Sequence, residues 1–236
     1  MKAIYKRELK SYFSSLIGYI FLAAFYLFEG IAFSEAYAYG SADLTSVFFN
    51  ILTLVAVIFL TPVLTMRLLS EDRRQKVDQA LLTAPVSVTG IVLGKFLAAF
   101  TVFAVAFAPT LIFQVIVSLH VTTLNWLIYL NALLGTLLTG AALIAIGLAI
   151  SSLTESQAIS CILTITAYAS LFAVTYIAEL TGVKFIMSIA EYLAIFDLLG
   201  DFGDSVFHIT DVAYLLSITA LFIFFSVRAV ERRRWA

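Results

Sequence analysis

Six apolar tracts, each about twenty residues or longer, alternate with short polar stretches along the chain. A helix rises about 1.5 Å per residue, so roughly 20 apolar residues cross the hydrocarbon core of a membrane. Because that core offers no water to backbone N–H and C=O groups, each tract is predicted to form an α-helix. The predicted spans cover about residues 16–36, 47–68, 91–119, 127–150, 158–178 and 212–230. The pattern therefore predicts an all-α polytopic membrane protein, with a single membrane domain over residues 1–236.

Two features inside these spans predict how the helices bend and pack. Pro62 in the second span and Pro109 in the third each remove a backbone donor, so a kink is expected at both. The fourth span carries small residues four positions apart, and such faces let helices approach closely, within the chain or against a second copy. The pairs are Gly135/Thr139, Thr136/Gly140, Ala141/Ala145/Ala149 and Gly147/Ser151.

Basic residues gather in three clusters, at residues 2–10, 67–95 and 228–234. Lys and Arg are retained on the cytoplasmic side, so six spans place all three clusters and both termini in the cytoplasm. The stretch 179–211 carries one base and six acids, and its apolar pieces are too short to span. A seventh span there would move the carboxy-terminal arginines outside. We therefore expect re-entrant or interfacial helices on the extracytoplasmic side before the last span.

The amino-terminal segment is predicted to be an interfacial helix. Residues 1–14 are basic and precede the first span, as in helices that lie along the inner membrane surface. The apolar tract that follows is too long for a signal-peptide core and lacks a small-residue cleavage site before Glu29. The first span is therefore expected to be retained.

The loop between the second and third spans contains a short amphipathic helix. Pro85 is expected to end it, and Ser87 to cap the next helix. Two interpretations are open: an interfacial helix resting on lipid headgroups, or a docking helix for a cytoplasmic partner. The apolar face consists of Val77, Ala80, Leu81 and Ala84, and the opposite face of Lys76, Asp78 and Gln79.

Glu29 is an acid inside the first predicted span. At about 1.5 Å per residue it lies about 20 Å into a core about 30 Å thick, in the outer half. A buried acid costs roughly 3 kcal/mol on insertion scales, and the apolar residues of the span offset that cost. Glu29 is expected to face protein or water. Two roles for Glu29 remain open: an interhelical hydrogen bond and a position on the substrate path.

The composition narrows the class of protein further. Hydrophobic residues make up 62% of the chain and charged residues 12%, whereas soluble domains are about 45–50% apolar and about 25% charged. Cys161 is the single cysteine, which excludes a disulfide framework, and His120 and His208 lie far apart, so no metal site is predicted. Membrane lipid is expected to be a partner of the chain, and nucleic acid is not.

No motif in the chain predicts catalysis. The stretch from Gly90 to Phe96 has three residues between its glycines where a phosphate loop needs four, and a phenylalanine where Ser or Thr must bind Mg²⁺. The acids of 191–211 are interpreted as a solvated surface and match no calcium loop. The chain is therefore not expected to be an enzyme or to bind a cofactor, and any ATP is hydrolysed by another chain.

Several blocks of the sequence resemble ABC-2 type transporter permeases. The blocks are TMRLLSEDRR, LLTAPVS and IVLGKFLAA within residues 65–99, GAALIAIGLAISSLTESQ at 140–157, and EYLAIFDLLGDFGDSVFHITDVAYLLSITALFIFFSVRAVERRRW at 191–235. The start YKREL, followed by SYF, is similar to the amino-terminal entry helix of these permeases. The chain resembles most the gliding-motility-type branch of the family.

This resemblance implies a permease subunit that forms half of a dimeric export path, with a second copy or a paralogue. It implies a bacterial or archaeal plasma membrane, and separate ABC ATPase subunits that bind ATP and Mg²⁺. In this family the loop helix is the coupling helix that seats in a groove of the ATPase. The residues expected to couple are Glu71, Arg74, Val77, Ala80, Leu81, Ala84 and Pro85.

Two other functions are alternatives to this one. An intramembrane enzyme would need an inward-facing His/Asp or Ser/Lys constellation, which the spans lack. A passive channel or a permease-like membrane scaffold without ATP coupling would not need an amphipathic docking helix. Copurification of an ATPase would separate both from the transporter hypothesis.

Overall fold

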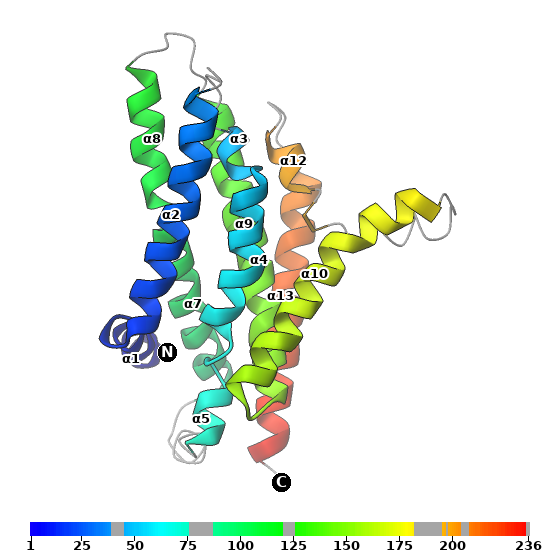
Figure 1. The fold of residues 1–236 in the computed structure, drawn as a ribbon. Helices are drawn as coiled ribbons and strands as arrows, with labels where there is room; N and C mark the ends of the chain where they lie inside the picture. The colour runs from blue at the N-terminus through cyan, green and yellow to red at the C-terminus, as the bar shows by residue number, and fades with distance from the viewer. Residues whose placement is uncertain are drawn as a thin grey trace.

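The computed structural model describes residues 1–38, 45–75, 87–119, 126–181, 195–196, 198–203 and 208–234. Every regular element in these parts of the chain is a helix, and the long helices run side by side as a bundle (Figure 1). The helices are α1 (Lys2–Ser14), α2 (Leu16–Ala38), α3 (Thr45–Phe48), α4 (Ile51–Thr65), α5 (Ser70–Arg74), α7 (Val88–Ala106), α8 (Ala108–Ser118), α9 (Trp126–Leu153), α10 (Gln157–Thr181), α12 (Leu198–Gly203) and α13 (Ile209–Arg234).

Within the described residues, six helical segments are long and apolar enough to cross a membrane, as the sequence predicts. This result confirms the all-α fold class and the multi-pass character of the chain. The segments are Leu16–Ala38, Ile51–Arg74, Val88–Ser118, Trp126–Leu153, Gln157–Val174 and Ile209–Arg233.

The second predicted span, 47–68, is not one continuous helix. It begins with the short α3, and Asn50 then interrupts the helix and caps α4, its side-chain oxygen accepting a hydrogen bond from the Leu52 N–H at 2.9 Å. An asparagine before an apolar run favours this break because its side chain satisfies a backbone donor at the helix start. The continuous part of this span therefore begins at Ile51.

The third predicted span, 91–119, is divided into α7 and α8 at Phe107. Pro109 lies in the first turn of α8, where its missing N–H leaves no hydrogen bond unmade, so the proline begins a helix instead of kinking one. The start of α7 agrees with the prediction for Ser87, whose hydroxyl accepts a hydrogen bond from the Gly90 N–H at 3.2 Å.

Helix α9 lies at the centre of the bundle, with α4, α7 and α13 packed around it (Figure 1). Its small residues serve packing within the chain. A Cβ atom at Gly140 would overlap the ring of Phe103 on α7, and one at Gly147 would overlap the side chain of Thr65 on α4. The small-residue face predicted for this span thus lets two neighbouring helices approach closely.

Both termini and α5 lie at the same end of the bundle (Figure 1). Every lysine and arginine whose position the structure describes is near this end, which we call the basic end. Helix α1 packs across it against α7, with Ile4 and Tyr12 buried and Ile4 in contact with Gly94. Predicted as an interfacial helix, α1 is therefore also a packed part of the bundle.

The predicted stretch of re-entrant helices, 179–211, is described only in part. Helix α10 extends to Thr181, and its second half leans away from the other helices (Figure 1). The six-residue α12 packs against α9, where the backbone oxygen of Phe202 accepts a hydrogen bond from the Asn131 side chain at 3.0 Å. Residues 182–194 and 204–207 lie outside the described residues, and the re-entrant arrangement stays a prediction.

Candidate functional site

A group of four charged side chains around the buried Lys95 joins three elements at the basic end. The Lys95 ammonium of α7 lies 3.0 Å from Oε1 of Glu8 on α1 and 2.8 Å from Oδ2 of Asp72 on α5. Arg7 of α1 lies 2.6 Å from the same Glu8 oxygen and 3.8 Å from the same Asp72 oxygen. We call these four residues the Lys95 cluster. Its two positive and two negative side chains balance each other.

The Lys95 side chain is 1% exposed, so its charge depends on these partners. A buried ion pair adds little compared with apolar packing, but removing one partner costs about 3–5 kcal/mol because the other charge is left alone. Burial acts to raise the pKa of Glu8, yet the charge and hydrogen bonds of Lys95 and Arg7 outweigh it and hold that pKa below its ordinary value. The Glu8 carboxylate therefore stays ionised at neutral pH.

Arg67 makes a second connection between α1 and the segment that follows α4. Its guanidinium donates hydrogen bonds to Ser11 Oγ at 2.8 Å and Ser15 Oγ at 3.0 Å. It also lies 5.5 Å from the ring centre of Tyr12 and 3.0 Å from Glu71 Oε2. Arginine suits such a position because its planar fork donates in several directions while its face stacks on an aromatic ring.

Tyr12 connects α1 to the last turn of α4. Its hydroxyl donates a hydrogen bond of 2.7 Å to the backbone oxygen of Leu64. The last carbonyls of a helix have no partner within it, so this contact satisfies a group that would otherwise be buried without one. Burial raises the pKa of Tyr12, which keeps the hydroxyl neutral and able to donate.

The end of α9 holds the same segment from the other side. The Ser151 hydroxyl accepts hydrogen bonds from the N–H groups of Leu69 and Ser70, both at 3.1 Å, and donates to the Met66 backbone oxygen at 3.1 Å. Arg73 lies 2.8 Å from Glu155, in the turn between α9 and α10. Residues 66–75, which we call the loop start, are therefore held by α1, α7 and α9.

The predicted coupling residues fall partly on the loop start. Glu71 pairs with Arg67 and accepts a hydrogen bond from the Gln75 side chain at 3.0 Å, so it helps to order this segment. Arg74 is exposed. The other predicted coupling residues lie at 76–86, outside the described residues, and their role stays a prediction. They are Val77, Ala80, Leu81, Ala84 and Pro85.

The Lys95 cluster was not found by sequence reasoning. One signal was present: a lysine eight residues into a predicted apolar helix needs a partner or a route to the interface. Its partners Glu8 and Asp72 belong to other elements, and nothing in their local sequence separates them from ordinary surface acids. Only the packing of α1 and α5 against α7 identifies them.

Glu29 is fully buried inside the chain, in the second half of α2, and α2 runs away from the basic end (Figure 1). Aromatic contacts between α2 and the third span lie on either side of it, Phe25 with Phe107 at 5.0 Å and Phe33 with Phe113 at 4.2 Å between ring centres. Neither carboxylate oxygen has a hydrogen-bond partner among the described residues. The interhelical hydrogen bond weighed for Glu29 is thus not formed there, and a role on the substrate path stays a prediction.

Comparison with known proteins identifies the family. The family model described as "ABC-2 family transporter protein" matches residues 28–228, most of the chain, from the buried Glu29 through the loop start and α9 to the start of the basic cluster on α13. No curated protein matches the chain. The match covers well over half of the sequence, and the six apolar helices fit a membrane component of a transporter. The chain therefore belongs to the ABC-2 family of transporter proteins.

Proposed function

We propose that this ABC transporter permease forms half of a dimeric export path and that separate ATPase subunits drive it by docking on the loop of residues 66–90. The family supports the permease role and, in general, an ABC ATPase partner. Export, the second copy or paralogue, and the gliding-motility-type branch are further parts of the proposal. They rest on the resemblance of the sequence blocks.

The observation that carries the proposal is how firmly the loop start is attached to the bundle. It is bound through Lys95 to α7, through Arg67 to α1 and through Ser151 to α9. A force applied to the loop would therefore reach three helices at once, because segments joined by ion pairs and hydrogen bonds move together. A loop that merely rests on headgroups would need no such attachment.

ATP and Mg²⁺ belong to the partner in this proposal. The glycines at 90 and 94, which superficially resemble a phosphate loop, both lie in α7. The Gly90 N–H donates to the Ser87 hydroxyl that caps this helix, and Gly94 lies beyond the first turn, where N–H groups bond within the helix. Gly94 also contacts Ile4 of α1 and so has a packing role. These observations support a chain that transmits the work of an ATPase and does not bind nucleotide.

The proposed orientation places the basic end in the cytoplasm of a bacterial or archaeal cell. Positively charged segments are retained on that side, and the lysines and arginines of the described chain gather at the end that holds both termini. The ATPase would then meet the loop of residues 66–90 in the compartment that contains ATP.

The experiment is copurification of the ATPase with variants of the loop helix. Burying Leu81 in a groove of the ATPase is worth about 1.5–3 kcal/mol, so its loss weakens docking by roughly ten- to a hundredfold. Leu81→Asp is expected to insert in the membrane yet lose the ATPase and ATP-driven transport. Lys76→Glu, on the opposite face, is the matched control and is expected to keep both.

Each alternative gives its own result. If Lys76→Glu loses the ATPase and Leu81→Asp keeps it, the polar face is the docking face and the assignment is reversed. If neither variant changes association or transport, the loop helix is not the docking element. A chain that transports with no ATPase present is a passive channel.

A further inference from the structure

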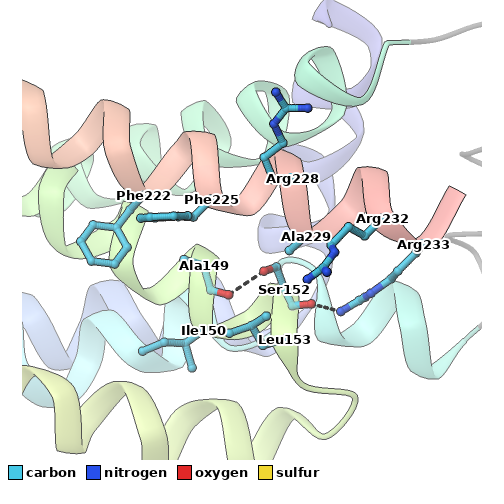
Figure 2. Close-up of a pocket in the computed structure, with 10 residues that line it drawn as sticks. All are labelled: Ala149, Ile150, Ser152, Leu153, Phe222, Phe225, Arg228, Ala229, Arg232 and Arg233. Carbon is cyan, nitrogen blue, oxygen red and sulfur yellow. Dashed lines mark hydrogen bonds between the residues drawn. The ribbon is translucent and has the colours of Figure 1, made fainter. Parts of the chain in front are cut away.

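A groove of about 660 Å³ lies between α9 and α13 at the basic end, apart from the loop start. Figure 2 shows its two sides: Ile150 and Leu153 from α9 on one, and Phe222 and Phe225 from α13 on the other. Ala229 leaves room between the helices. These side chains make the greater part of the groove apolar.

The mouth of the groove is basic. Arg232 and Arg233 extend from the last turns of α13 near the end of α9 (Figure 2). Arg233 donates a hydrogen bond to the backbone oxygen of Ser152, which fixes α13 against α9 there. Arg232 is exposed and has no ion pair among the described residues. The charge of Arg228 is partly balanced by Glu231, 3.1 Å away.

The distance between the apolar and basic parts matches one leaflet of a bilayer. Arg232 lies ten positions after Phe222 on α13, which corresponds to about 15 Å along a helix. Half of a hydrocarbon core about 30 Å thick is also about 15 Å. With the arginines at the headgroup level, the groove therefore runs alongside the acyl chains of the same leaflet.

We propose that this groove binds one anionic phospholipid of the leaflet at the basic end. The phosphate lies at Arg232 and Arg233, and an acyl chain lies along Ile150, Phe222 and Phe225. Basic pockets between membrane helices are suited to anionic headgroups, because the charges attract the phosphate while the chain stays in an apolar environment. The site is independent of the docking of any ATPase.

Charge and shape favour a phospholipid over two other occupants. A soluble anion would meet the arginines but leave the long apolar walls unfilled. A second copy of this chain, placed on the groove by a two-fold axis, would bring the arginine-rich ends of two α13 helices together. A phospholipid supplies both the negative charge and the apolar chain.

The bound lipid has a structural consequence at the basic end. It would bridge α9 and α13 beside Ser152, next to Ser151, which holds the loop start. Anionic lipid is therefore expected to raise the thermal stability of the purified chain more than zwitterionic lipid does.

The test is native mass spectrometry of the purified chain with phosphatidylglycerol or phosphatidylcholine. The wild-type chain is expected to retain one phosphatidylglycerol in preference to phosphatidylcholine. Arg232→Gln should reduce that retention about fivefold, the equivalent of about 1 kcal/mol for one charge. Ala229→Phe should block the chain-binding part without changing any charge. Arg74→Gln, an exposed arginine of α5, is the control and should retain the lipid.

Three results would overturn the proposal. Equal retention of the two lipids by the wild-type chain would mean that no anionic site exists. Displacement of phosphatidylglycerol by excess glycerol phosphate would assign the arginines to a soluble anion. Loss of a dimer in Ala229→Phe, with lipid retention unchanged, would assign the groove to an interface between copies of this chain.

Discussion

The two ends of the helix bundle bury ionisable side chains in different ways. At the basic end, Lys95 is surrounded by Glu8, Asp72 and Arg7, and every charge of the Lys95 cluster has an opposite charge within 4 Å. In the other half, Glu29 is equally buried, yet neither of its oxygens has a hydrogen-bond partner among the described residues. A paired buried charge holds elements together, whereas a buried polar group without a partner weakens the fold that contains it.

This difference indicates different roles for the two regions. The Lys95 cluster joins α1, α5 and α7, so it makes the basic end one mechanical unit with the loop start. Glu29 makes no such ion pair, and its place on the substrate path stays a prediction. Opposite effects on stability are therefore expected when Lys95 and Glu29 are replaced by apolar residues.

The largest effect is expected for Lys95→Met, which keeps most of the length of the side chain and removes its charge. Glu8 and Asp72, both largely shielded from solvent, would then share only the exposed Arg7, and the free energy of unfolding should fall by about 3–5 kcal/mol. Thermal unfolding of the purified protein measures this loss. Lys10→Met is the control, because Lys10 is exposed on the same end of the bundle, and it should change stability little. Equal stability of the two variants would mean that the cluster does not hold the basic end.

Glu29→Leu is expected to stabilise the fold, opposite to Lys95→Met, and by a smaller amount. Removing a buried polar group that lacks a partner should raise the free energy of unfolding by about 1–3 kcal/mol. Transport should fall if Glu29 lies on the substrate path, and Glu29→Gln separates the loss of the ionisable group from the loss of polarity. A chain that is more stable and transports at full rate would show that Glu29 is incidental to transport.

The smallest effect is a dependence of stability on pH. The pKa of Glu8 is lower in the folded chain than its ordinary value of 4.5, so the folded state gains from its ionisation. That stabilisation is fully present above pH 4.5 and is lost as the pH falls through the lowered pKa. Unfolding temperatures measured down through this range should fall less steeply for Glu8→Gln than for the wild-type chain. Parallel curves would show that Glu8 does not contribute to the acid sensitivity.

Local signals were enough to predict much of the fold. The length and apolarity of the spans, the cap at Ser87 and the small residues of α9 are properties of neighbouring positions, and the structure agrees with each. The break before Ile51 was missed although Asn50 carries a local capping signal. The break at Phe107 was not predicted, because Pro109 was expected inside one continuous span, whereas it lies in the first turn of α8.

The contacts of the candidate site were beyond the sequence for a physical reason. The sequence by itself determined the membrane class, the helical spans and the grouping of basic residues, because a bilayer constrains each apolar segment independently of the others. The pairing of Lys95 with residues 87 and 23 positions away, and the burial of Glu29 among aromatic rings, depend on which helices pack together and at what rotation. Only the tertiary structure decides that, because one apolar helix face is chemically much like another until a neighbour covers it.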